Sequence, residues 1–370
     1  YHWKWSNTFR MGCKEMIFKY MKRPFSSREL QVLGQKEPLM PGRPTSTIFN
    51  APVSYRQNAL ALLCDKSPCF AVTGNDFSAL TCGYYQKNLG RGNRLEPEKI
   101  DTFGVKWIYE PVAGGSISVG GNPRFTDAND WKNVISMPDI NKWDWAADAA
   151  EHPVDTNFAV QVTMANGFWF ERLISLMDFM NAAIALIDEE QRDALHELFE
   201  ETTQLACDLV DKICEYWPAV DGFMIHDDWG SQRDPFFSDS TARELFLPHM
   251  KKLVCHVHKQ GRYCGIHSCG HAEDRVNIFI SAGFDTWQMQ PNANNIYKLY
   301  DEVGDKIVLQ VAIPAFDLND EKAAVQAARD YADTFCKPGK PTMLIPCDAF
   351  KSKAFAEEVY TCSRKRYLDQ

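Results

Sequence analysis

The sequence predicts an α/β fold, a (β/α)8 TIM barrel with an N-terminal arm and an inserted β-hairpin. From residue 158 onward, short apolar strand patterns alternate with amphipathic helix patterns, and nothing interrupts the alternation. Such alternation implies a parallel sheet, and eight strands closed into a barrel are its economical form. The chain has 370 residues, of which 45% are apolar, so it can bury the core that one large barrel needs.

The chain begins with an irregular stretch. Residues 1–50 contain a helix pattern near Lys14–Met21, and several prolines then break its continuation. We expect these residues to form an arm on a single barrel domain that covers residues 51–370. Within that domain, two short strand patterns in residues 103–121 flank a Gly-Gly pair, which predicts the inserted β-hairpin.

Seven barrel strands are visible as short apolar runs followed by polar or glycine-containing segments. They are Cys69–Thr73, Phe158–Met164, Val220–Ile225, Arg262–His267, Phe284–Trp287, Lys306–Val311 and Thr342–Ile345. We expect the eighth strand in the aromatic middle section around Trp131–Trp145. The same section otherwise has the features of a loop held by aromatic packing.

The composition excludes several classes of partner. A formal net charge of −9 and a pI near 5.5 argue against nucleic acid or an anionic membrane surface. No run of about eighteen apolar residues predicts a membrane span. The twelve cysteines lack the compact spacing of a disulfide framework, so we expect reduced thiols in a cytoplasmic protein.

The most informative motif is His267–Gly270, which ends a predicted strand. Side chains alternate along a strand, so His267 and Cys269 point the same way. Cys347 ends a second short apolar run and supplies a further thiol. One imidazole and two thiolates predict a zinc site of three protein ligands, and the open fourth position is typical of catalytic zinc.

Polar residues follow or end other predicted strands, where barrel enzymes carry their chemistry. Asp227 and Asp228 could bind a cation, orient a metal ligand or take a proton, and we assign them catalytic roles. A capped turn would use the same residue types. The residues expected to bind substrate are Asn75, Asp76, Trp229, Gln232, Trp287 and Gln290.

Three segments together resemble a known family. Phe223–Gln232, His267–Gly270 and Ala282–Asp285 are similar to the uroporphyrinogen decarboxylase superfamily, and more closely to its corrinoid-dependent methyltransferase (O-demethylase-like) branch. The resemblance implies a (β/α)8 barrel and zinc held by the His-x-Cys pair and the distal cysteine. It also implies methyl transfer to or from the cobalt of a separate corrinoid protein. The chain itself has no cobalt-ligating Asp-x-His-x-x-Gly motif.

Within this resemblance we favour methyl transfer from a small donor, such as a methoxylated aromatic compound, to the corrinoid. A methylcorrinoid:thiol methyltransferase of the coenzyme M type is an alternative. Decarboxylation is a weaker one, because Phe70–Asp76 lacks the substrate-binding arginines of the decarboxylases. An inactive metal-binding scaffold would need a fourth protein ligand, for which His271 is the candidate. The sequence is also compatible with a homodimer.

Overall fold

The computed structural model describes residues 23–38, 44–112 and 115–368. The helix expected near Lys14–Met21 lies outside these residues. The cysteines within these residues form no disulfide bond with one another. In the same part of the chain, no helix is long and apolar enough to cross a membrane.

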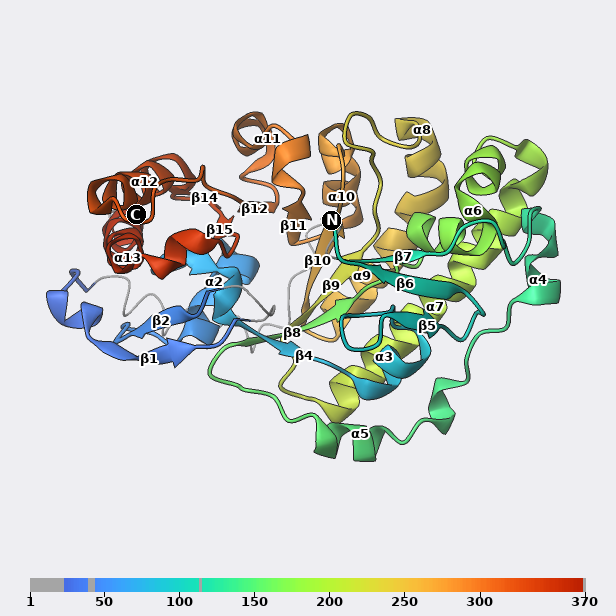
Figure 1. The fold of residues 1–370 in the computed structure, drawn as a ribbon, viewed down its shortest axis with the longest axis horizontal. Helices are drawn as coiled ribbons and strands as arrows, with labels where there is room; N and C mark the ends of the chain where they lie inside the picture. The colour runs from blue at the N-terminus through green and yellow to red at the C-terminus, as the bar shows by residue number, and fades with distance from the viewer. Residues whose placement is uncertain (1–22, 39–43, 113–114, 369–370) are drawn as a thin grey trace. The chain divides into compact units, whose positions relative to one another are not determined.

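Eight parallel strands form one sheet, with helices between most of them along the chain, which confirms the predicted (β/α)8 fold; Figure 1 labels these elements. The order of the strands in the sheet is β3-β15-β12-β11-β10-β9-β8-β4. Their bounds are β3 (Val72–Thr73), β4 (Phe77–Leu80), β8 (Ala159–Met164), β9 (Gly222–His226), β10 (Tyr263–Ser268), β11 (Thr286–Met289), β12 (Val308–Val311) and β15 (Met343–Leu344).

The prediction of the eighth strand was wrong. It is β4, which follows β3 after the three-residue 3-10 helix η2 (Gly74–Asp76), rather than a strand in the aromatic section. No α-helix separates β3 from β4, so the alternation that reveals the other strands is missing here. The aromatic section instead forms short helices, and Trp131 and Trp145 are buried.

The chain divides into two compact units. The first unit comprises residues 1–79, 154–161 and 285–370, and the second comprises residues 80–153 and 162–284. Besides its barrel strands, the first unit contains η1 (Ser27–Leu30), β1 (Val32–Lys36), β2 (Ser46–Phe49), α2 (Tyr55–Asp65), η8 (Pro291–Ala293), α11 (Ile296–Val303), α12 (Glu321–Phe335), β13 (Cys336–Lys337), β14 (Lys340–Pro341), η9 (Asp348–Lys351) and α13 (Lys353–Leu368).

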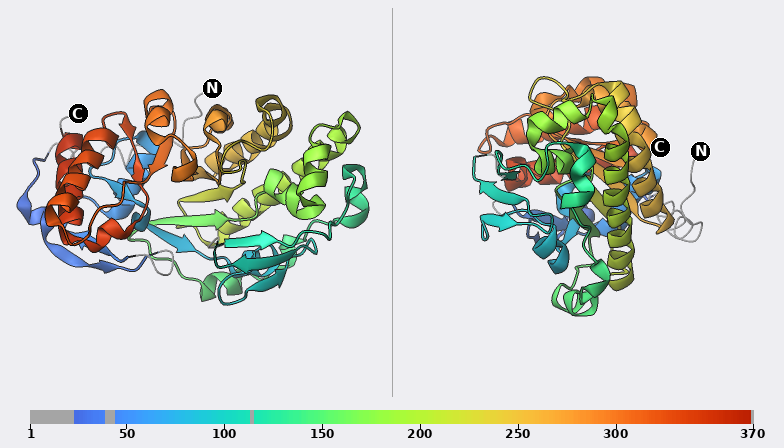
Figure 2. Two further views of the ribbon diagram at one scale, coloured as in Figure 1. Left: turned by 45° about the horizontal axis from the view of Figure 1, so that its top comes forward. Right: turned by 90° about the vertical axis from the view of Figure 1, so that its right-hand side faces the viewer.

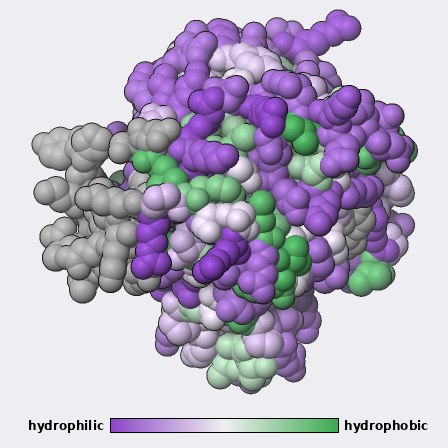
Figure 3. Space-filling view, turned by 90° about the vertical axis from the view of Figure 1, so that its left-hand side faces the viewer, coloured by the Kyte–Doolittle hydropathy of each residue, from purple (hydrophilic) through white to green (hydrophobic). Residues whose placement is uncertain are grey.

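The described part of the N-terminal arm packs on the C-terminal helix of the first unit. The buried side chains of Tyr360 and Arg364 on α13 both contact Glu29 of η1, at 2.8 and 3.2 Å from its Oε2 atom. A buried charge is stable only when it is paired, so this contact fixes η1 on α13. Figure 3 shows a face of the molecule that is mostly hydrophilic, with hydrophobic residues scattered over it.

The second unit carries the inserted hairpin. Strands β6 (Lys106–Glu110) and β7 (Gly115–Ser118) pair antiparallel, as predicted, and β5 (Glu98–Ile100) adds a third strand. The other elements of this unit are α3 (Gly83–Asn88), η3 (Ala128–Asp130), α4 (Trp131–Val134), η4 (Ile140–Lys142), α5 (Trp145–Glu151), α6 (Phe170–Ala185), η5 (Glu189–Gln191), α7 (Arg192–Tyr216), α8 (Asp239–Thr241), η6 (Ala242–Phe246), α9 (Leu247–Lys259), η7 (Glu273–Arg275) and α10 (Val276–Ala282).

Candidate metal centre

Two neighbouring parallel strands of the second unit place the central motif. Strands β9 and β10 pair in register from Gly222 opposite Tyr263 to His226 opposite His267. The pairing continues past β9, because the N–H of Asp227 donates to the carbonyl of His267 at 3.0 Å. The residues that follow each strand therefore emerge side by side at the C-terminal end of the barrel.

This register brings three potential ligand side chains together. His267 Nε2 lies 3.1 Å from Cys269 Sγ, as their shared strand face predicts. Asp228 Oδ1 accepts a hydrogen bond from the N–H of Cys269 at 2.8 Å and lies 3.7 Å from His267 Nε2. One ligand atom from each residue lies within 4.8 Å of those of the other two, so the three could hold one metal ion.

The surroundings keep the thiol of Cys269 and the imidazole of His226 neutral when no cation is bound. Burial, and then the carboxylate of Asp228, raise the pKa of the Cys269 thiol to about 12. The ring of His226 lies 4.4 Å from that of His267, and burial followed by His267 lowers the pKa of His226 well below its ordinary value. The imidazole of His226 is therefore neutral and lies against the imidazole of His267.

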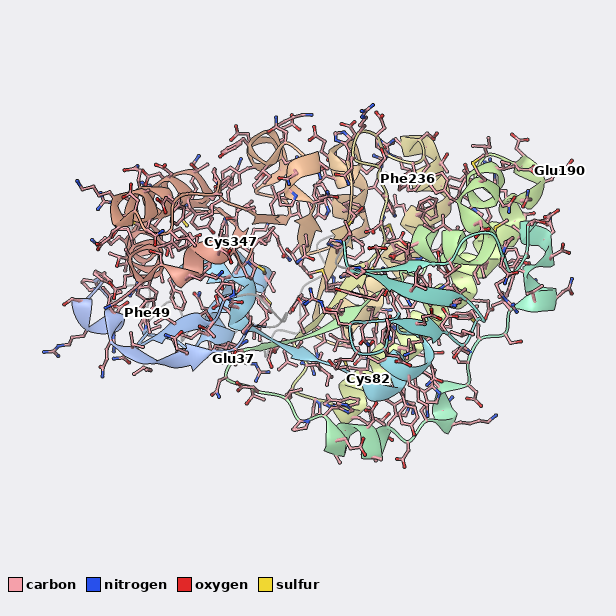
Figure 4. All side chains as sticks on the ribbon, in the orientation of Figure 1. Glu37, Phe49, Cys82, Glu190, Phe236 and Cys347 are labelled. Carbon is pink, nitrogen blue, oxygen red and sulfur yellow. The ribbon has the colours of Figure 1, made fainter. Side chains whose placement is uncertain are left out.

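The donor set fits zinc. Zinc in proteins is bound by nitrogen, sulfur and oxygen atoms. A bound divalent cation would stabilise the thiolate form of Cys269, which burial alone destabilises. Cys347 follows β15 in the first unit, where it immediately precedes η9 and is half-buried (Figure 4). Its part in the zinc site stays a prediction.

Asp227 differs from its neighbour Asp228. It is fully buried, and its carboxylate accepts hydrogen bonds from the N–H groups of Phe170 and Glu171 and from the indole N–H of Trp229, at 2.6 to 3.2 Å. It therefore caps the first turn of α6. Burial raises its pKa to about 7. This geometry favours a positioning role for Asp227 over contact with a substrate.

Sequence reasoning missed Glu171 and Arg91. Glu171 is buried and forms an ion pair with Arg91, while its Oε2 atom has no hydrogen-bond partner among the described residues. Burial raises its pKa to about 7, although Arg91 opposes the shift. The signal in the sequence is only a charged residue at the start of a helix. Arg91 lies eighty residues earlier, and no spacing rule connects the two.

The two tryptophans predicted to bind substrate are not accessible from the barrel mouth. Trp229 and Trp287 are both fully buried. Trp229 packs in the second unit against Phe237 and Phe279, at ring distances of 5.1 and 4.9 Å. Phe236, labelled in Figure 4, is half-buried against Phe170.

The remaining predicted substrate residues are distributed over both units. Gln232 is exposed in the second unit, whereas Gln290 is half-buried in the first. Asn75 and Asp76 are buried in η2 of the first unit. Asp76 Oδ2 accepts a hydrogen bond from the N–H of Thr73 at 2.7 Å, which closes the capping box of that short helix. Asp76 therefore has a structural function whatever else it does.

Comparisons with known proteins do not assign a family. No protein-family model matches the chain, and no curated protein matches it. Among solved structures it is similar to a methyltransferase from Methanosarcina mazei, at 14% identity over 68% of this chain and 72% of that chain, with a TM-score of 0.46. A xylose isomerase-like TIM barrel protein from Mycobacterium smegmatis matches at 11% identity over 63% and 80%, with a TM-score of 0.32. An intracellular xylanase from Thermoanaerobacterium saccharolyticum matches at 13% identity over 55% and 68%, with a TM-score of 0.30. With identities this low and TM-scores below 0.5, inference about function depends on the residues of this chain.

Proposed function

We propose that this chain is a zinc-dependent methyltransferase that moves a methyl group from a small donor to the cobalt of a separate corrinoid protein. The observation that carries the proposal is the group of Asp228, His267 and Cys269, whose ligand atoms converge at the ends of two parallel strands. The C-terminal ends of the strands are where barrel enzymes place catalytic residues.

In this proposal His267, Cys269 and Cys347 hold the zinc. The metal supplies Lewis acidity, which stabilises negative charge on the group that leaves the methyl carbon. Asp228 fixes the backbone of Cys269 through its hydrogen bond and faces the imidazole of His267. Removal of such an orienting partner typically costs about 10–100-fold in metal affinity or activity.

The described surroundings favour a small polar donor. Within the second unit the metal group neighbours His226, and the ion pair of buried Glu171 with half-buried Arg91 acts electrostatically on Cys269, whereas Trp229 is buried in the core. Buried polar groups discriminate strongly between ligands that satisfy them and ligands that do not. We therefore rank polar methyl ethers and methylated amines above a plain methoxyarene.

The described geometry does not support His271 as the fourth ligand of a structural zinc. Its side chain groups instead with Glu273 and Asp274, and its Nε2 atom lies 3.8 Å from Asp274 Oδ2. This separate grouping weighs against an inactive scaffold. It leaves the direction of transfer, to a corrinoid or from a methylcorrinoid to a thiol, for an assay to decide.

The test is a methyl-transfer assay with zinc analysis of the same samples. Purified protein is mixed with cob(I)alamin and a panel of donors, and in a second arm with methylcobalamin and coenzyme M. We expect one zinc per chain and methylation of cobalt in the first arm. Activity in the second arm alone would reverse the direction of the proposed transfer, and no activity in either arm with any donor would refute the function.

Variants assign the ligands. Cys269→Ser and Cys347→Ser should each lose most of the zinc while far-ultraviolet circular dichroism stays unchanged, because the barrel core does not depend on the metal. Cys82→Ser is the control, since Cys82 is a thiol that, like Cys269, lies beside a carboxylate. Full zinc content in Cys347→Ser would remove that residue from the site. Stoichiometric corrinoid in the purified chain would contradict the separate partner.

A further inference from the structure

A second pair of facing histidines lies between two helices of the second unit. Helices α7 and α9 pack on each other (Figure 2), with His196 on the first and His249 on the second. His196 Nδ1 lies 3.2 Å from His249 Nε2, and the ring planes are inclined by 42°. His249 is buried, whereas His196 is half-buried and accessible from the surface.

These two rings border a cavity of about 440 Å³, which is large enough for an ion with several waters. Trp131 and Lys132 of α4 and the side chains of Glu197, Glu200 and Glu201 on α7 complete the lining, and Lys132 pairs with Glu197 at 2.6 Å. The indole N–H of Trp131 is buried and has no hydrogen-bond partner among the described residues. A donor beside the cavity without a protein acceptor indicates that the cavity holds solvent or a ligand.

The carboxylate of Glu200 sets the tautomer of His249. Glu200 Oε2 lies 3.4 Å from His249 Nδ1, and its Oε1 accepts a hydrogen bond from Lys252. The hydrogen bond from Lys252 lowers the pKa of Glu200, so its carboxylate is ionised and accepts the Nδ1 hydrogen of His249. The lone pair of His249 then lies on Nε2, toward His196. Burial and the neighbouring His196 lower the pKa of His249 to about 4, which keeps the ring neutral.

This arrangement matches half of a tetrahedral metal site. Two nitrogen ligands about 2.0–2.1 Å from one zinc ion are separated by about 3.3 Å, and the observed separation is 3.2 Å. Metal-binding histidines commonly donate their other ring N–H to a carboxylate, as His249 does to Glu200. We propose that His196 Nδ1 and His249 Nε2 form a second metal site, for a transition-metal ion that prefers imidazole, such as zinc, nickel or copper. Water completes the coordination. The carboxylate of Glu201 offsets part of the charge of the ion, whereas that of Glu197 is already paired with Lys132.

The site is independent of the proposed methyltransferase activity, and its test counts ions. Full-length wild type and variants are titrated with nickel chloride or zinc chloride in a calorimeter. His196→Gln and His249→Gln should each bind one ion fewer than wild type. His256→Gln is the matched control, because His256 lies on the same helix and pairs with Asp211 at 2.7 Å, away from the cavity. It should bind as many ions as wild type.

A further variant and a spectrum separate the site from a plain hydrogen bond between imidazoles. Glu200→Gln should weaken the binding of that ion by about 10–100-fold. Copper added at one equivalent beyond the strand-end site should show nitrogen couplings in electron paramagnetic resonance that disappear in His196→Gln. Equal ion counts in wild type, His196→Gln and His249→Gln would overturn the proposal and leave the hydrogen bond. If His249→Gln fails to fold, His196→Gln alone decides, because its side chain is half-exposed.

Discussion

Two places in the second unit contain the same three residue types. At the ends of β9 and β10, Asp228 lies beside His267 and Cys269. At the start of α3, Asp148 lies beside Cys82 and His152, with Cys82 Sγ 3.2 Å from Asp148 Oδ2 and His152 Nδ1 2.7 Å from Asp148 Oδ1. The pKa of each thiol is raised to about 12, chiefly by burial.

The two groups differ in where their ligand atoms point. Cys82 and His152 bind opposite oxygens of Asp148, and the N–H groups of Gly83 and Tyr84 also donate to that carboxylate. The Asp148 side chain is only 3% exposed, against 33% for Asp228. The carboxylate of Asp148 thus caps a helix, and both of its oxygens already accept hydrogen bonds. The ligand atoms of Asp228, His267 and Cys269 instead lie close enough together to hold one ion. Convergence, rather than residue type, distinguishes a candidate metal centre from a capped helix.

The largest expected effect contrasts the two cysteines. Cys269→Ser should lose most of the bound zinc, and its loss of methyl transfer should exceed the roughly 10–100-fold that an outer-shell substitution costs. Cys82→Ser should keep both, because a serine hydroxyl can donate to Asp148 in place of the thiol. Zinc analysis by mass spectrometry and the cobalamin assay measure this difference. Equal zinc loss in both variants would contradict the assignment of the Cys269 group as a metal centre and of the Cys82 group as a helix cap.

The second contrast concerns the two carboxylates. Asp228→Asn should reduce turnover by about 10–100-fold with little change in stability, because the amide oxygen of asparagine can still accept the hydrogen bond from the N–H of Cys269. Asp148→Asn should instead leave turnover unchanged and lower the free energy of unfolding by about 1–3 kcal/mol, because buried cap donors lose an acceptor. Urea denaturation and steady-state rates provide both measurements. A stability loss in Asp228→Asn larger than that in Asp148→Asn would reverse the assignment.

The sequence predicted that His267 and Cys269 lie together, but not that Asp228 joins them as a potential ligand, nor the supports around them. Strand parity is local, so the proximity of His267 and Cys269 could be inferred from two positions in one strand. Asp227 and Asp228 are adjacent and chemically identical, and only tertiary hydrogen bonds to α6 separate the cap from the exposed carboxylate. The ion pair of Glu171 with Arg91 joins positions with no common period, so no pattern in the sequence could reveal it.

The same limit explains the errors over aromatic side chains and the eighth strand. Trp229 follows a strand end, and local reasoning places such a residue at the barrel mouth. Its side chain instead packs against Phe237 and Phe279, because a large apolar ring is stabilised by burial. Strand β4 has only four residues, and no helix precedes it to mark its start. Periodicity therefore predicts the long elements, while packing decides the direction of single side chains and the pairing of short strands.

Asp76 is a third capping carboxylate, and its contribution to stability should depend on pH. Asp76 caps η2 much as Asp148 caps α3, and burial raises its pKa from an ordinary 3.8 to about 7. Between these values the unfolded chain releases the proton and the folded chain keeps it. The stabilising contribution of the protonated group is therefore complete below about pH 4 and lost as pH rises through about 7.

Asp76→Asn removes this dependence. Relative to wild type, the variant should gain stability as pH rises from 5 to 8, by at most about 3 kcal/mol. Thermal unfolding of both proteins across that pH range measures the gain, and Asp148→Asn at the same pH values is the comparison for a cap substitution. A stability difference that does not change with pH would mean that Asp76 is already ionised in the folded protein at pH 5.

The smallest expected effect tests how tightly the capped group is packed. A Cβ atom at Gly83 would lie 2.7 Å from Asp148 Oδ1 and 2.9 Å from His152 Cε1, so the cap must shift to admit it. Part of that cost is offset because alanine favours a helix more than glycine does. Gly83→Ala should therefore lower the free energy of unfolding by about 1 kcal/mol and leave the zinc content unchanged. Gly115→Ala is the control, since no atom lies within 4 Å of its added Cβ. If Gly83→Ala is as stable as Gly115→Ala, Asp148 and His152 can move freely, and the rigid cap that separates this group from the strand-end site does not exist.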